Sequence, residues 1–308
     1  MRAVVTGATG FVGRRLLSRL QNPVVLTRNP DKAKASLGQA NVAAYAWDPE
    51  REPAPAAAFE GVDAVFHLAG EPVAEGRWTA AKKRRIQNSR ELGTRNLVQT
   101  LTRLPVKPKV LVSASAVGYY GSRGDDVVDE SAPPADDFLA EVCEAWERES
   151  RPATEAGMRV ANPRIGIVLG SGGGALAKML TPFKLGAGSP LGSGRQYMPW
   201  IHLDDLVGLL LFAAEHDSLH GPFNATAPHP VTNREFTKAL GKAVHRPTFL
   251  PPVPQFVLRT MLGEFADVLL ASQRVVPKAA QDAGYRFQFP ELGPALDNIL
   301  HAQNRPSP

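Results

Sequence analysis

The chain of 308 residues has a single cysteine, Cys143, and no uninterrupted apolar segment as long as a membrane span requires. One cysteine excludes an internal disulfide and is typical of proteins from a reducing compartment. The first predicted strand begins at residue 2, which leaves no room for a signal peptide. We therefore expect a cytoplasmic protein that does not enter a membrane.

Two features that often mark a nucleic-acid or metal site have simpler interpretations here. The basic run at residues 82–85 continues into apolar residues at helical spacing, which predicts the exposed side of a helix. His216 and His220 have a metal-ligand spacing, but Gly221 follows at once and no third ligand is near. We expect no nucleic acid and no metal, whereas the net charge of +5 suits an anionic ligand such as a nucleotide.

A glycine-rich turn near the amino terminus is the strongest signal in the sequence. A short apolar strand at residues 2–6 leads directly into Gly7-x-x-Gly10-x-x-Gly13, and an amphipathic helix follows at residues 14–20. Gly7 permits a tight turn, Gly10 lets a pyrophosphate approach the backbone, and Gly13 lets the helix pack closely on the sheet. This order predicts a dinucleotide site at the helix start. The residues expected to contact the cofactor here are Gly7, Thr9, Gly10, Phe11, Val12 and Gly13.

The second predicted strand, at residues 24–27, indicates which dinucleotide is bound. A site for NAD usually places an acidic residue at the end of this strand, where it binds the ribose 2′-hydroxyl. The sequence has Arg28 there instead, with Thr27 and Asn29 as neighbouring donors. Because a guanidinium matches a 2′-phosphate in shape and charge, we predict NADP(H). The alternative interpretation of Arg28 is an exposed loop cation.

Strands and helices alternate through the first 169 residues, which predicts a Rossmann-type, doubly wound parallel α/β sheet. The expected strands are residues 2–6, 24–27, 42–47, 62–70, 109–114 and 160–169, separated by helices at 14–20, 31–38, 79–102 and 138–154. The end of the fourth strand, Leu68, Ala69, Gly70 and Glu71, should line the cofactor, whereas His67 should pack inside the sheet.

The remaining sequence predicts a smaller, mostly helical substrate-binding region. We assign residues 1–169, with about 200–220, to the NADP-binding domain. Residues from about 170 to 199 and from 221 to 308 are assigned to the substrate-binding region. Helices are expected at 175–183, 206–214, 233–244, 255–262 and 290–302, with a disordered tail after Gln303. Asp204 and Asp205 precede the helix at 206–214 and are interpreted as its N-terminal cap.

These motifs together resemble an extended short-chain dehydrogenase/reductase. The glycine turn, the end of the fourth strand, Gly93-Thr94 and residues 115–121 carry that resemblance. Residues 77–79, 146–147, 172–176, 192–205 and 221–224 narrow it to the bacterial "epimerase family protein" group, which is related to sugar-nucleotide epimerases. The resemblance implies a hydride-transferring enzyme with a small polar or nucleotide-linked substrate, present as a monomer or homodimer.

The sequence departs from that family at its catalytic pair. Short-chain dehydrogenases use Tyr-x-x-x-Lys, in which the lysine and the cofactor ribose lower the pKa of the tyrosine. Alignment on Glu147 places Leu139 at the tyrosine and Cys143 at the lysine position. The resemblance maps the family's serine to Ser115, or to a position one residue away, because Val117-Gly118 carries an extra residue. Tyr120 and Tyr119 are the nearest replacement acids, and both could equally pack in the cleft wall.

Substrate residues are expected in the glycine-rich second half. Arg195, Trp200 and His202 lie within eight residues of one another, a mixture of cation and rings that suits a polar or anionic ligand. By the resemblance, Arg195 matches the position that grips a nucleotide diphosphate. Packing in the core is the alternative for Trp200 and His202. With Tyr119, these form the predicted substrate site.

Two functions from different classes follow. The first is an NADP(H)-dependent epimerase or reductase that uses Ser115 and Tyr120. The second is a non-catalytic NADP(H)-binding redox sensor or regulator, which the loss of the tyrosine–lysine pair favours.

Overall fold

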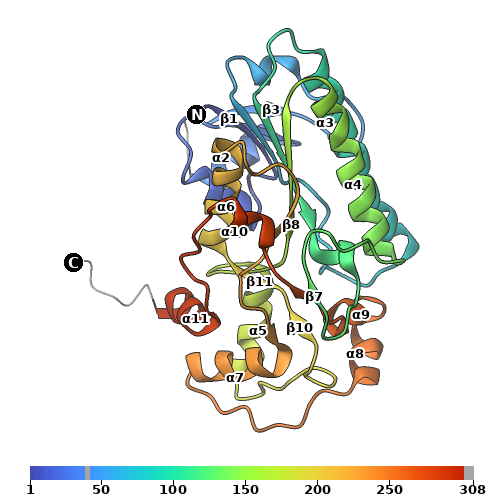
Figure 1. The fold of residues 1–308 in the computed structure, drawn as a ribbon, viewed down its shortest axis with the longest axis vertical. Helices are drawn as coiled ribbons and strands as arrows, with labels where there is room; N and C mark the ends of the chain where they lie inside the picture. Colours follow the sequence, from blue (N-terminus) through green and yellow to red (C-terminus); the bar gives the residue numbers. More distant parts are fainter. Residues whose placement is uncertain (39–41, 302–308) are drawn as a thin grey trace, which may run out of the picture.

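The main sheet of the molecule is the doubly wound parallel sheet that the sequence predicts (Figure 1). The computed structural model describes residues 1–38 and 42–301, and the tail expected to be disordered lies outside them. Seven strands run in the order β12-β8-β5-β4-β1-β2-β3, and an eighth, β6, pairs with β8. Every pairing in this sheet is parallel.

The helices and strands have the following bounds. The strands are β1 (Ala3–Thr6), β2 (Val24–Thr27), β3 (Ala43–Ala46), β4 (Ala64–His67), β5 (Val110–Ser113), β6 (Ser115–Ala116), β7 (Val127–Val128), β8 (Arg159–Ile165), β9 (Ile167–Leu169), β10 (Tyr197–Met198), β11 (Trp200–His202), β12 (Gly221–Ala225), β13 (Val231–Thr232) and β14 (Arg274–Val275). The helices are α1 (Phe11–Leu17), α2 (Pro30–Leu37), α3 (Ala80–Arg103), α4 (Phe138–Glu155), α5 (Gly174–Lys184), α6 (Leu203–Glu215), α7 (Asn233–Ala243), α8 (Gln255–Leu262), α9 (Phe265–Leu270), α10 (Lys278–Asp282) and α11 (Leu292–His301), with 3-10 turns η1 (Ala56–Phe59) and η2 (Val117–Tyr120).

Both faces of the sheet are covered because its central strands are apolar at successive positions. Val5 of β1 packs in one core with residues of α1 and α6, whereas Val4 faces the other core, to which α3 contributes Leu97 and Leu101. Since successive side chains of a strand point to opposite faces, a strand without alternation is buried on both sides. All four residues of β1, β4 and β5 are buried.

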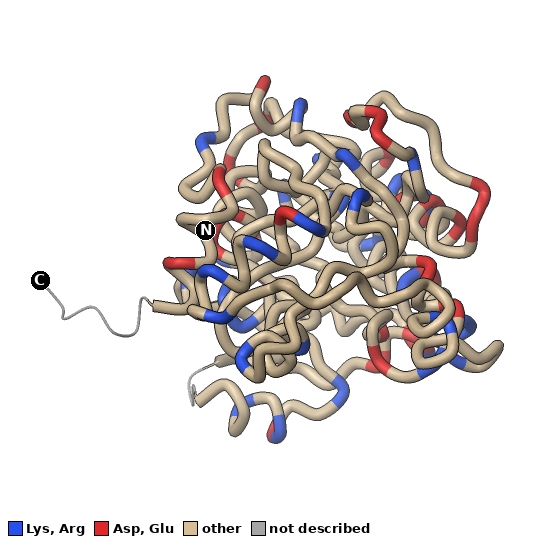
Figure 2. Tube along the Cα trace, turned by 90° about the horizontal axis from the view of Figure 1, so that it is seen from below, with Lys and Arg blue, Asp and Glu red and all other residues tan. Residues whose placement is uncertain are grey.

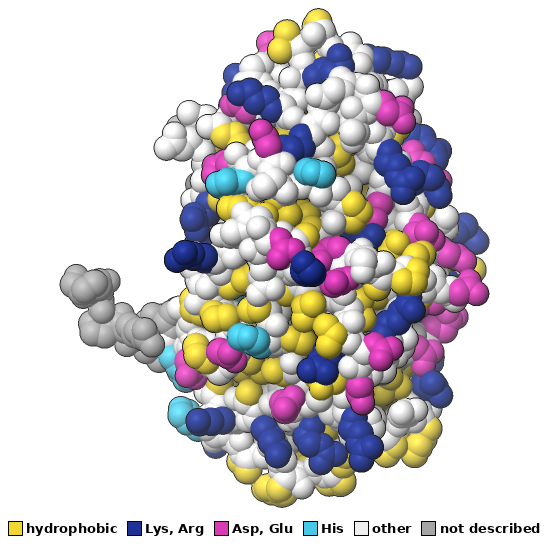
Figure 3. Space-filling view, viewed as in Figure 1, with side chains coloured by type: hydrophobic (Ala, Val, Ile, Leu, Met, Phe, Trp, Pro, Cys, Tyr) yellow, Lys and Arg dark blue, Asp and Glu magenta, His cyan; other side chains and the backbone are white. Residues whose placement is uncertain are grey.

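The lower part of the molecule has a core of its own. Buried side chains of α5, α7 and α11 pack there around the indole of Trp200. On the face drawn in Figure 3, hydrophobic side chains show mainly in the middle of the molecule, and Lys and Arg side chains lie along its lower part. Figure 2 shows basic and acidic residues interspersed along the chain.

The structure corrects the predicted strand at residues 160–169. It divides at Gly166, after which β9 leaves the main sheet and pairs with β11. A Cβ atom at Gly166 would lie 2.2 Å from the carbonyl oxygen of Pro199, so the two segments meet in contact. The turn therefore requires glycine, and the apolar sequence on both sides concealed it.

The structure also moves the predicted boundary at residue 221. Residues 221–225, which we assigned to the substrate region, form β12 and extend the main sheet beside β8. Residues after the lower helices also return to the upper part of the molecule. There β14 and β7 form a separate two-stranded sheet, and Asn224 of β12 donates to the Val276 carbonyl at 2.9 Å. The C-terminal segment thus contributes to both parts of the molecule.

Candidate functional site

The glycine-rich turn lies directly against the end of β4. Gly7 has a φ of +67°, and a Cβ atom there would lie 2.8 Å from the carbonyl group of Leu68. A Cβ atom at Gly13 would lie 2.3 Å from the Gly7 oxygen. Both glycines are therefore needed for the chain to turn this closely. No side chain caps the start of α1, so the N–H groups of its first turn are available to an anion.

The side chain of Phe11 points away from the turn and joins it to a second glycine-rich loop. Cβ atoms at Gly170, Gly173 and Gly174 would each lie less than 3 Å from the Phe11 ring. These glycines leave room for the ring between α1 and the start of α5. The predicted contact of Phe11 with the cofactor would accordingly use its backbone.

Arg28 is exposed at the end of β2, as the cofactor prediction requires. Its guanidinium makes no hydrogen bond or ion pair with any residue that the structure describes. Asn29 is occupied instead, because its side chain caps α2 by accepting the N–H of Lys32 at 2.9 Å. Of the residues predicted to bind the 2′-phosphate, Arg28 thus carries a positive charge that no described residue pairs with.

His67 packs inside the sheet and fixes the end of β4. The hydroxyl oxygen of Thr6 accepts the N–H groups of Leu68 and Ala69, both at 3.1 Å, so its own hydrogen points to Nδ1 of His67 at 2.8 Å. The Nε2–H group then donates to Thr94 at 3.1 Å. Burial lowers the pKa of His67 to about 4, which keeps the ring neutral.

Glu71, the last residue predicted to line the cofactor, is held by α3. Its carboxylate accepts from Lys82 at 2.8 Å and from Arg85 at 3.3 Å, and these cations lower its pKa. Half of the basic run at residues 82–85 therefore binds the loop after β4.

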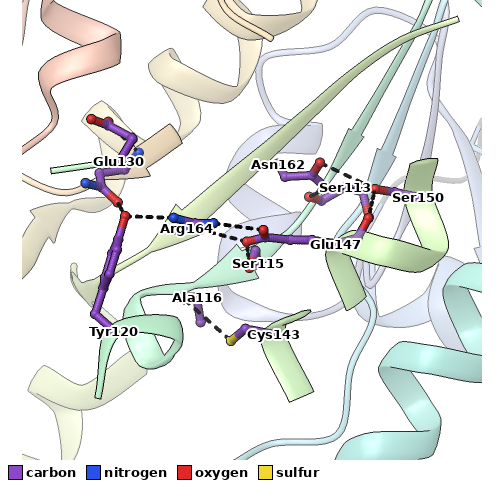
Figure 4. Close-up of polar contacts among 11 residues, drawn as sticks. Ser113, Ser115, Ala116, Tyr120, Glu130, Cys143, Glu147, Ser150, Asn162 and Arg164 are labelled. Atoms are coloured by element: carbon purple, nitrogen blue, oxygen red, sulfur yellow. Dashed lines mark hydrogen bonds and ion pairs between the residues drawn. The ribbon is translucent and has the colours of Figure 1, made fainter. Parts of the chain in front are cut away.

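A buried polar network joins β6, β8 and β12 to α4 near the carboxyl ends of the strands (Figure 4). Strand register places Ser115 and Asn224 on either side of Arg164. The Arg164 guanidinium donates to both carboxylate oxygens of Glu147, at 2.8 and 2.9 Å, and Ser115 donates to the same carboxylate at 2.7 Å. All four side chains are buried. A bidentate ion pair thus connects α4 to the sheet.

Tyr120 belongs to this network. Its hydroxyl donates to Asn224 at 2.7 Å and accepts from Arg164 at 3.0 Å, and the side chain is fully buried. Burial raises its pKa to about 12 despite the neighbouring Arg164. The half-buried ring of Tyr119 lies 3.5 Å from Arg164, face to guanidinium. The two tyrosines that the sequence predicts as replacement acids therefore lie against Arg164, a residue that the sequence analysis did not identify.

The positions of the missing catalytic pair are apolar. Leu139 fills the space against Gly118, where a Cβ atom would meet the leucine Cβ at 3.2 Å. Cys143 is buried, and its thiol donates to the carbonyl oxygen of Ala116 at 3.5 Å. Burial raises the pKa of the thiol to about 11. Cys143 accordingly behaves as a small apolar residue.

The structure does not bring the predicted substrate residues of the second half together. Trp200 is fully buried and donates to the carbonyl oxygen of His229 at 3.1 Å. His202 is buried, packs against the ring of Phe289 and accepts the N–H of Asp204. Both are buried because β11 runs through the interior, as the packing alternative expects. Arg195 alone is exposed.

The N-terminal cap of α6 is His202 rather than the predicted aspartates. Asp204 instead pairs with Arg15 of α1 at 2.5 Å, and Asp205 accepts N–H groups from the C-terminal segment. Because α6 ends at Glu215, His216 and His220 both lie beyond it. Within residues 1–38 and 42–301, no group of three His, Cys, Asp or Glu residues could hold a metal ion.

Glu147, Arg164 and Asn162 are the site residues that sequence reasoning did not assign. Asn162 donates to the Ser113 carbonyl at 3.1 Å. The sequence contained a signal for two of them. Asn162 and Arg164 lie within an otherwise apolar predicted strand, and buried polar side chains require partners.

A glycine turn at the carboxyl edge of a doubly wound sheet is typical of dinucleotide-binding proteins, the class to which short-chain dehydrogenases belong. The chain belongs to the NAD dependent epimerase/dehydratase family, whose model matches residues 3–225, and residues 253–299 match a domain of unknown function (DUF1731). No helix in the described ranges is both long and apolar enough to span a membrane.

Relatives extend this likeness to the whole chain. Epimerase family protein SDR39U1 homolog, chloroplastic, from Arabidopsis thaliana is 42% identical, over 97% of this chain and 87% of its own. Epimerase family protein YfhF from Bacillus subtilis is 36% identical, over 97% and 98%. The crystal structure of human epimerase family protein SDR39U1 (isoform2) with NADPH has a TM-score of 0.87 and 35% identity, over 98% and 99%. The resemblance seen in the sequence is confirmed.

Proposed function

We propose that the protein binds NADP(H) and is a short-chain-type epimerase or reductase acting on a polar, possibly nucleotide-linked, substrate. The unused guanidinium of Arg28 at the end of β2 is the observation that carries the choice of NADP(H) over NAD(H). The human relative crystallised with NADPH supports the same choice. The bound nicotinamide would supply or accept hydride.

The residues present fit such a cofactor. Gly7 and Gly13 let the backbone turn closely against the end of β4, where a Cβ atom would meet main-chain atoms, and the uncapped start of α1 offers N–H donors. The ends of β1 and β4 form the floor, held by Thr6 and His67. We propose that Arg28 binds the 2′-phosphate there.

For the substrate side, we propose Ser115 as the hydroxyl that orients a reacting oxygen. Glu147 and Arg164 hold its position, and the latter is fixed by Tyr120. A pKa near 12 makes Tyr120 a weak proton donor at neutral pH, so its proposed role is to position Arg164. Arg195 remains the proposed contact to an anionic substrate group.

Titration with NADPH and NADH, followed by nicotinamide fluorescence, tests the cofactor. We expect the wild-type protein to favour NADPH, and Arg28→Asp to weaken NADPH binding at least about tenfold while improving that of NADH. Arg148→Asp is the matched control, because it makes the same charge change at an exposed position of α4. Equal binding of both cofactors by the wild type would remove Arg28 from its role.

A non-catalytic NADP(H)-dependent sensor is the second candidate. Leu139 and Cys143 favour it, since neither can replace the tyrosine–lysine pair, and the hydroxyl of Tyr120 is already bonded. Sugar nucleotides and carbonyl compounds should be screened by nicotinamide absorbance. Turnover that Ser115→Ala lowers strongly supports an enzyme; turnover unchanged by Ser115→Ala contradicts the serine assignment.

A further inference from the structure

A second arginine at the carboxyl edge of the sheet has no role in the network described above. Arg90 lies in the first half of α3, and its side chain reaches the end of β4. Its Nη1 donates to the carbonyl oxygens of Glu71 and Ile86, both at 3.1 Å. A Cβ atom at Gly70 would lie 3.2 Å from its Cζ atom. The guanidinium therefore touches the backbone predicted to line the cofactor.

The charge of Arg90 is half-buried and has no acidic partner among the described residues. The nearest carboxylate, that of Glu71, is bonded to Lys82 and Arg85 instead. Only Nη1 of Arg90 has acceptors, so Nε and Nη2 donate to nothing that the structure describes. Both nitrogens are open to solvent rather than buried, so their N–H groups are available to a ligand that binds at this edge of the sheet.

The orientation of Arg90 is fixed by α4. Its guanidinium lies 5.0 Å from the ring of Trp146, a cation–π distance. It is also close enough to Cys143 for its charge to oppose the rise in the thiol pKa. A cation from α3 thus stands beside the position where related enzymes carry the lysine of their catalytic pair.

The two arginines lie on opposite sides of the glycine turn. β1 pairs with β2 on one side, where Arg28 follows, and with β4 on the other, where Arg90 lies. A dinucleotide crosses this edge with its adenosine half over β2 and its other half over β4. We propose that Arg90 binds the nicotinamide ribose, whose hydroxyl oxygens accept its free N–H groups in place of the absent lysine. This inference rests on the proposed NADP(H) site.

Binding of whole and truncated cofactor separates the two arginines. Calorimetric titration uses NADPH and adenosine 2′,5′-bisphosphate, which keeps the 2′-phosphate but lacks the second ribose. We expect Arg90→Met to weaken NADPH about tenfold or more and to leave the bisphosphate unchanged. Arg28→Met should weaken both ligands. Arg84→Met, an exposed arginine of the same helix, controls for the loss of charge.

The outcomes distinguish the inference from the function it rests on. Arg90→Lys, which keeps the charge, should lose less NADPH affinity than Arg90→Met, and thermal unfolding verifies that both variants fold. Equal loss of both ligands in Arg90→Met would show that Arg90 only shapes the loop. No loss of either would place it outside the site. A wild-type protein that binds neither ligand would overturn the NADP(H) site itself.

Discussion

Glu147 is the central side chain of the polar network at the candidate site. Its carboxylate is buried, and it receives three hydrogen bonds from Arg164 and Ser115. A buried ion pair need not stabilise a fold more than apolar residues would, but the loss of one partner leaves a buried charge uncompensated. The pair therefore fixes geometry at the site, and its disruption should be costly.

We expect Glu147→Gln to lower the free energy of unfolding by about 3 kcal/mol, because it leaves Arg164 buried without an opposite charge. Urea unfolding monitored by circular dichroism measures this. Glu144→Gln is the control, since Glu144 is exposed on the same helix. A loss below about 1 kcal/mol would mean that water reaches Arg164.

At the scale of elements, one histidine joins two neighbouring strands and a helix. His67 of β4 bonds Thr6 of β1 and Thr94 of α3 while the Thr6 hydroxyl holds the backbone after β4. This arrangement uses the neutral ring, with hydrogen on Nε2. The loop that we propose lines the cofactor therefore depends on the protonation state of a residue inside the sheet.

The pH dependence of stability follows from that ring. The pKa of His67 is about 4 in the fold and 6.5 when exposed, so the unfolded chain binds more protons between these values. Stability should be complete above pH 6.5 and should fall as the pH decreases toward 4, by about 2 kcal/mol between pH 7 and pH 5. Urea unfolding at both values tests this.

His67→Gln should reduce that difference between pH 7 and pH 5, because glutamine does not titrate. His220→Gln, which removes an exposed histidine, should leave it as in the wild type. The same pH difference in the His67 variant as in the wild type would show that other groups cause the dependence.

At the scale of the whole molecule, the C-terminal segment is fastened to the sheet domain by carboxylates. Asp205, at the start of α6, accepts the N–H groups of Gln288 and Phe289 at 2.7 and 2.9 Å. Glu130 accepts those of Asn224 and Ala279 at 2.9 and 3.2 Å. The chain thus returns across the first domain before α11 enters the lower core.

We expect Asp205→Asn to increase hydrogen exchange in residues 284–301 and to cost about 1–2 kcal/mol of stability, because an amide satisfies these two donors less well. Exchange followed by mass spectrometry measures the segment directly. Asp204→Asn is the control, since it removes only a partly exposed ion pair with Arg15. If hydrogen exchange changed equally across the whole chain, Asp205 would not be holding this segment in particular.

The backbone of the proposed cofactor site could be predicted from the sequence because its determinants are local. The glycine turn, the apolar strands and Arg28 occupy one continuous stretch, and glycine spacing dictates the backbone there. The burial of His67 followed from an apolar strand in the same way. The turn at Gly166 was missed, since the contact that requires it comes from Pro199, more than thirty residues later.

The sequence by itself determined the parallel sheet, its glycine turn and the cation at the end of β2, through patterns that act within a few residues. Only the tertiary structure decided which polar side chains meet. The register of β6, β8 and β12 brings Ser115, Arg164 and Asn224 together, and α3 carries Arg90 to the end of β4. Trp200 and His202, neighbours in sequence, are buried instead, because pairing in β11 and packing against the lower helices set the direction of each side chain.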